Sequence, residues 1–180
     1  MDRRPQPSAG RFRSRFNLQF NDRPTNELIG HVDPGMKREA LREARRNLND
    51  LTMPAKAFND ALNAILTHTD KLKPWTRLVE SAYERLPKRD RPSTRFFIMS
   101  FRAGRHDYDG VLRLMPQRFA GIFALVILAY VMEAALALDK QDLLRKLVKR
   151  LPHAIEDAEH PIMREHLQFC LSEAYKRYGC

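Results

Sequence analysis

The chain has 180 residues, 43% of them hydrophobic and 30% charged, and its 32 basic and 22 acidic residues give a formal net charge of +10. This length is enough for one domain with its own core, and the ordinary apolar share excludes collagen-like and wholly disordered chains. Two cysteines, Cys170 and Cys180, are too few for a disulfide-built fold or a four-thiolate zinc site.

The first segment, residues 1–34, is predicted to be a disordered basic tail. Its arginines stand among prolines, serines and glycine, and it has no apolar stripe of helical spacing. Arg11, Arg13 and Arg15 are interleaved with phenylalanines, so the tail is a candidate accessory arm toward a polyanion. It contains no apolar run of secretory-signal length, and a cytoplasmic location is expected.

Residues 35–180 are predicted to form a single helical domain. Apolar residues recur there at i, i+3, i+4 and i+7, and no segment alternates with a period of two, so strands are not expected. Asp33-Pro34, Thr52 and Pro74 are typical of helix starts, because Asp and Thr cap helices and proline fits in the first turn. The predicted helices begin near residues 34, 52, 74, 92, 108, 119, 140 and 161. The predicted fold class is all-α, with stacked antiparallel helix pairs.

Three of these helices are predicted to end alike, with apolar residues at i, i+3, i+4 and i+7 followed by a proline. They are residues 79–86 before Pro87, 108–115 before Pro116 and 144–151 before Pro152. This helix end resembles the tetratricopeptide-repeat family, and Val79, Ala82 and Pro87 match its large residue, small residue and proline. The Trp and Leu-Gly signature of the family's first helix is absent. The resemblance, over about residues 55–178, implies a curved stack of helix pairs that binds peptides or proteins; an irregular helical bundle is the alternative.

The most apolar segment is 119–138, where only Gly121 and Glu133 fall outside the hydrophobic set. Twenty helical residues rise about 30 Å, which equals the thickness of a bilayer core. Basic residues flank both ends, however, and six alanines within the segment favour close packing between helices. The segment is predicted to be a buried core helix, and a membrane-spanning helix is the alternative.

No catalytic, cofactor or metal site is predicted. The acidic and histidine residues at 106–109 and 153–166 suit solvated connections between helices. Cys170 stands between Phe169 and Leu171, as expected of a packed thiol, and phosphate-loop, dinucleotide-loop and serine-nucleophile motifs are absent from the chain. The chain is therefore expected not to be an enzyme.

The basic excess is uneven, because residues 119–180 carry 8 basic and 8 acidic residues, whereas nine basic residues face three acidic ones from Arg85 to Arg118. This basic stretch leads into a predicted helix start, where backbone amides can hold a phosphate. The candidate polyanion-binding residues are Arg89, Arg91, Arg95, Arg102 and Arg105 of this stretch, with Arg11, Arg13 and Arg15 of the tail.

These observations lead to three hypotheses of function. The first is a non-enzymatic helical scaffold that binds another macromolecule, with a protein as the expected partner. The second is an RNA- or DNA-binding helical protein that uses residues 85–118 and the tail. The third is a protein anchored in a membrane by residues 119–138.

Overall fold

The computed structural model describes residues 34–121, 123–159 and 161–179, which form nine α-helices and one short 3-10 helix without a strand. The elements are α1 (Pro34–Asn49), α2 (Ala55–His68), η1 (Lys73–Trp75), α3 (Thr76–Arg85), α4 (Arg91–Gly104), α5 (Tyr108–Arg113), α6 (Ala124–Ala137), α7 (Gln141–Val148), α8 (Leu151–Glu156) and α9 (Pro161–Tyr178). The predicted all-α class is confirmed. The predicted tail lies outside the described residues, except for Pro34, which begins α1.

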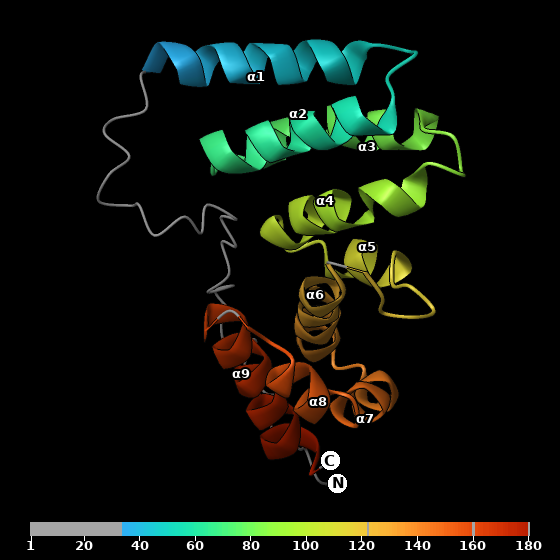
Figure 1. Cartoon of the computed structure of the whole chain (residues 1–180), viewed down its shortest axis with the longest axis vertical. Helices are drawn as coiled ribbons and strands as arrows, with labels where there is room; N and C mark the ends of the chain where they lie inside the picture. The colour runs from blue at the N-terminus through green and yellow to red at the C-terminus, as the bar shows by residue number, and fades with distance from the viewer. Residues whose placement is uncertain (1–33, 122, 160, 180) are drawn as a thin grey trace, which may run out of the picture.

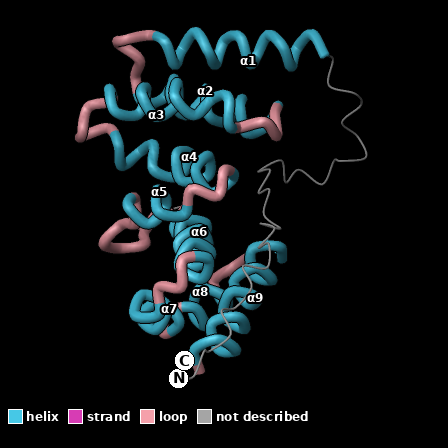
Figure 2. Tube along the Cα trace, turned by 180° about the vertical axis from the view of Figure 1, so that it is seen from behind, coloured by secondary structure: helices cyan, strands magenta, loops and turns pink. Residues whose placement is uncertain are grey.

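The helices form successive pairs along an elongated stack (Figure 1). Short connections join α1 to α2 and α3 to α4, and the two members of each pair run in opposite directions. The second members form a continuous row, since α2 contacts α4, α4 contacts α6, and α6 contacts α9. Seen from behind, the same order runs from α1 at one end to α7, α8 and α9 at the other (Figure 2).

Helix α4 lies between two groups of buried apolar side chains. Ile98 and Phe101 on one side of α4 belong to the core formed with α1, α2 and α3. Phe96, Met99 and Ala103 on the other side belong to the core formed with α5 to α9. Because α4 packs on both sides, it is the element that connects the two halves of the stack.

The helix boundaries near Pro54 and Pro152 differ from the prediction. Thr52 does not cap α2, because its amide and hydroxyl both donate to the Asp50 carboxylate at 2.8 Å, and Pro54 is the N-cap residue. Pro152 does not end a helix, since α7 stops at Val148 and Pro152 lies in the first turn of α8, which the prediction missed. Proline lacks an amide proton and fits equally well after a helix or in its first turn.

The apolar segment 119–138 forms a shorter helix than predicted. Gly121 takes a left-handed backbone angle (φ 84°), and α6 begins only at Ala124. Its 14 residues rise about 21 Å, which is less than a bilayer core of about 30 Å. Every residue from Val126 to Leu136 is buried, so the predicted core helix is confirmed. Within the described ranges, no helix is long and apolar enough to cross a membrane.

Candidate functional site

Arg102, one of the candidate polyanion-binding residues, lies between three helices. Its guanidinium donates to both carboxylate oxygens of Glu80 on α3, at 3.0 and 2.6 Å, and to the Gly110 carbonyl on α5, at 2.9 Å. Burial by itself lowers the pKa of Arg102, but the hydrogen bond and the charge of Glu80 outweigh burial, so the pKa is raised. Arg102 therefore ties α4 to α3 and α5.

The start of α5 beside Arg102 is shaped by Asp107. Its carboxylate accepts a hydrogen bond from the Gly110 amide at 3.0 Å, which caps the helix, and lies 4.0 Å from the Arg102 guanidinium. A Cβ atom at position 110 would come within 2.2 Å of the Asp107 carboxylate, so this contact requires glycine. The same glycine offers its carbonyl to Arg102.

Two further candidates also make contacts within the stack. Arg91 donates to the carbonyls of Glu84 and Leu86 at 2.8 and 3.2 Å, which satisfies the last turn of α3. Arg105 lies 3.9 Å from the Glu80 carboxylate, and its guanidinium stands 5.5 Å from the centre of the Phe101 ring. Both arginines are therefore occupied in holding helices together.

The remaining described candidates lie at the surface. The Arg89 side chain is 87% exposed and lies 3.7 Å from Asp90, while Arg95 is half-buried on α4. The structure thus leaves two of the five candidates from the basic stretch free of helix-bridging contacts. The candidates of the tail, Arg11, Arg13 and Arg15, lie outside the described residues.

The structure also brings together polar groups of two segments that the sequence did not connect. Glu133 in the middle of α6 is buried, and its carboxylate accepts a hydrogen bond from the Tyr108 hydroxyl at 3.2 Å. The His106 ring lies 3.1 Å from the same hydroxyl. Burial raises the pKa of Tyr130 to about 12, and the Glu133 charge adds to this effect. Buried Glu133 of the central apolar helix is thus joined to the half-buried Tyr108 and the exposed His106, a contact between helices that periodicity does not indicate.

A cysteine and a histidine are paired inside α9. The Cys170 thiol lies 3.6 Å from the His166 ring nitrogen Nε2, one turn away. Burial raises the pKa of Cys170 and lowers the pKa of His166 to about 4, so both groups stay neutral near pH 7. A nucleophilic pair needs a thiolate, which this environment disfavours. Cys170 is the packed thiol that the sequence predicts; the four-residue spacing to His166 was the available signal of their contact.

The buried His166 ring makes stability depend on pH. Its pKa is lower in the folded protein, about 4, than in the unfolded chain, about 6.5, so acid favours unfolding in this interval. Between about pH 7 and pH 4.5, we expect His166 to account for a loss of about 2.5 kcal/mol in the free energy of unfolding. The loss should be absent from His166→Gln, as measured by urea unfolding at both pH values.

His153→Gln is the matched control for this prediction, because the His153 side chain is 85% exposed. It should lose as much stability in acid as the wild-type protein does. An unchanged acid-induced loss in His166→Gln would contradict the assignment of this loss to the buried ring.

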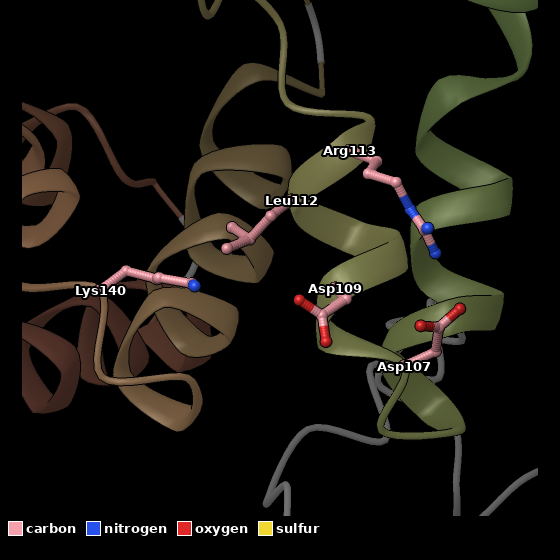
Figure 3. Close-up of a pocket in the computed structure, with 5 residues that line it drawn as sticks. All are labelled: Asp107, Asp109, Leu112, Arg113 and Lys140. Atoms are coloured by element: carbon pink, nitrogen blue, oxygen red, sulfur yellow. The ribbon is translucent and has the colours of Figure 1, made fainter.

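A shallow open depression of about 610 Å³ lies beside α5. It is lined by Asp107, Asp109, Leu112, Arg113 and Lys140. Lys140 reaches toward Asp109 from the connection before α7, while Arg113 points toward α4 (Figure 3). The opposite charges balance, and with one apolar residue the depression lacks the apolar walls typical of small-ligand sites. In the described part of the chain, no three His, Cys, Asp or Glu side chains are grouped as metal ligands.

No protein family, curated protein or solved structure matches this chain. Function is therefore inferred from the placement of its side chains. Cys170, His166 and Glu133 are buried, whereas exposed charges and aromatic rings lie on the outer faces of the helices.

Proposed function

We propose that this chain is a non-enzymatic helical scaffold that binds another macromolecule, with a protein as its partner. The observation that carries the proposal is the burial of the reactive groups: Cys170, His166 and Glu133 are each at most 7% exposed. Substrates do not reach such groups, and the outer faces of the paired helices are the surfaces that a partner meets. The tetratricopeptide-like helix end at residues 79–87 supports the same role, because stacks of this kind bind partners along their helices.

The outer face of α9 is the partner surface that we favour. This last helix packs on α6, α7 and α8 with its inner side. Phe169 and Tyr175 on α9 remain 45% and 49% exposed. Aromatic side chains are enriched at protein interfaces, where they give large contact areas at little entropic cost. Three basic and two acidic residues give α9 a net charge of only +1, which suits a protein partner better than a polyanion.

Site-specific photo-crosslinking tests this proposal. A benzophenone amino acid replaces Tyr175 in the full chain, and crosslinked protein is identified by mass spectrometry. The captured protein is then purified, and its affinity for the wild-type chain is measured. We expect Phe169→Glu/Tyr175→Glu to weaken this affinity by about tenfold or more, because the loss of interface aromatics costs 2 kcal/mol or more at central positions.

The matched control, Met36→Glu/Leu51→Glu, places the same two charges at exposed apolar positions in the α1 half of the stack. It should bind the partner as the wild-type chain does, and circular dichroism confirms that both variants are folded. Equal loss of affinity in the two variants, or no specific adduct from position 175, would contradict α9 as the partner surface.

A further inference from the structure

Helices α1 and α3 lie side by side and run in the same direction (Figure 1), and five arginines of these two helices stand out. Arg38, Arg42 and Arg45 follow one another at spacings of four and three residues on α1, and Arg77 and Arg85 lie eight residues apart on α3. All five are exposed. These five residues are called the α1–α3 seam.

Two contacts show that Arg45 and Arg85 border the line between the helices. The Arg45 guanidinium lies 5.1 Å from the centre of the Trp75 ring, which directly precedes α3. Arg85 donates to the Leu48 carbonyl of α1 at 2.6 Å and to the Ser81 hydroxyl at 2.8 Å. Arg85 therefore holds α3 against α1, and the other four arginines of the seam are the ones that a ligand meets. Residues three and four apart share a side of a helix, so Arg42 continues the row of Arg45 along α1.

The positive charge of the seam exceeds the acidic charge on the same helix sides. None of its five arginines forms an ion pair with a carboxylate of the described residues. Glu39 lies three residues before Arg42 on α1 and Glu84 lies seven residues after Arg77 on α3, so these two carboxylates share a helix side with the arginines. Five arginines against two glutamates leave the seam with a net charge of +3. Arg102 and Arg105, by contrast, share Glu80. A surface with this excess of positive charge raises the local concentration of anionic partners.

We propose that the α1–α3 seam binds the phosphate backbone of nucleic acid, a function beyond that of a protein scaffold. All five cations are arginines, whose planar guanidinium groups bind phosphate oxygens in pairs. At a rise of 1.5 Å per residue, Arg38 and Arg45 are separated by about 10 Å along α1, and Arg77 and Arg85 by about 12 Å along α3. A strand with phosphates about 3.4 Å apart along its axis places three or four of them along this length.

Fluorescence polarisation of the full chain with labelled RNA and DNA of one sequence, about 20 nucleotides long, tests the proposal between about 50 and 200 mM salt. The test variant is Arg38→Gln/Arg42→Gln/Arg77→Gln, whose three side chains are exposed. Among the described residues they form no ion pair. We expect about a tenfold or greater loss of affinity at the lower salt concentration. The slope of log affinity against log salt should fall by about 2, near 0.7 for each lost phosphate contact.

The control variant, Arg145→Gln/Lys149→Gln/Arg150→Gln, removes three exposed charges at the other end of the stack. It should bind both probes within about twofold of the wild-type chain, since overall charge alone gives no specific contact. The proposal would be overturned if this control variant lost as much affinity as the seam variant. It would also be overturned if the seam variant bound the probes as tightly as the wild-type chain does. The tail variant, Arg11→Gln/Arg13→Gln/Arg15→Gln, should retain the salt dependence that is assigned to the seam. If this variant lost all binding, the nucleic-acid site would lie in the tail and the proposal would be wrong. Displacement of RNA by polyglutamate at equal charge would instead indicate an acidic protein ligand.

Discussion

Replacing Phe101 with alanine is expected to lower the free energy of unfolding by about 3–5 kcal/mol. The Phe101 ring is fully buried on the side of α4 that faces the first three helices. The substitution leaves a cavity, and α4 cannot move to fill it because α4 also packs against the second core. The loss in the free energy of unfolding should therefore reach the full value for a buried phenylalanine. Urea unfolding followed by fluorescence measures the change, since the chain has one tryptophan, Trp75, in the same core.

Met99→Ala is the companion variant, because it empties the opposite side of α4 at an expected cost of about 2–5 kcal/mol. A single helical domain, as predicted for residues 35–180, unfolds in one step, so both variants should shift the Trp75 fluorescence and the helical circular dichroism together. Met36→Ala, at an exposed position, should change the free energy by less than about 0.5 kcal/mol. A Trp75 transition that stays in place in Met99→Ala would show that the two cores unfold separately.

Arg102→Ala should lower the free energy of unfolding by about 2–4 kcal/mol. The substitution removes both hydrogen bonds to Glu80 and the bond to the Gly110 carbonyl, so a half-buried carboxylate loses its main cation. Replacing both partners, as in Arg102→Met/Glu80→Met, should recover much of this loss, because no charge is then left unpaired. Thermal and urea unfolding of the two single variants and the double variant give the interaction energy, expected at about 1–3 kcal/mol.

Lys56→Ala is the control for this cycle. Lys56 and Asp60 approach each other to 2.6 Å, as Arg102 and Glu80 do, but their side chains are 86% and 59% exposed. Solvent screens such a pair, so its loss should cost about 0.5 kcal/mol or less. If Arg102→Ala costs no more than Lys56→Ala, the proposed role of Arg102 in joining three helices is wrong.

Helix positions followed closely from local pattern, whereas helix ends at prolines did not. The apolar spacing in 76–86 and 94–103 reports directly on the sides of α3 and α4 that are buried. Pro87 follows a helix and Pro152 begins one, although each comes after the same apolar spacing. The spacing of apolar residues describes a single helix. The different positions of Pro87 and Pro152 depend on packing against helices that are distant in sequence.

The candidate site was predictable only in part. Clustering of arginine in 85–118 was visible from the sequence, but the partners of Arg102 and Arg91 come from α3 and α5 and appear only on packing. The α1–α3 seam was not predictable from the sequence. Its arginines are spread over about 50 residues, and their two helices come together only in the folded chain. The position of Glu133 in the apolar helix was likewise visible from the sequence, but its hydrogen bond with Tyr108 of α5 was not.

The sequence by itself determined the all-α class, the apolar character of the central helix and the absence of an activated cysteine motif, because these depend on composition and local periodicity. Only the tertiary structure decided which arginines join helices by hydrogen bonds and which remain exposed to solvent. A guanidinium has the same charge in both cases, and its role depends on whether a carboxylate or carbonyl from another helix lies within hydrogen-bond distance. Arg102 has such partners on α3 and α5, and Arg42 faces solvent beside α3.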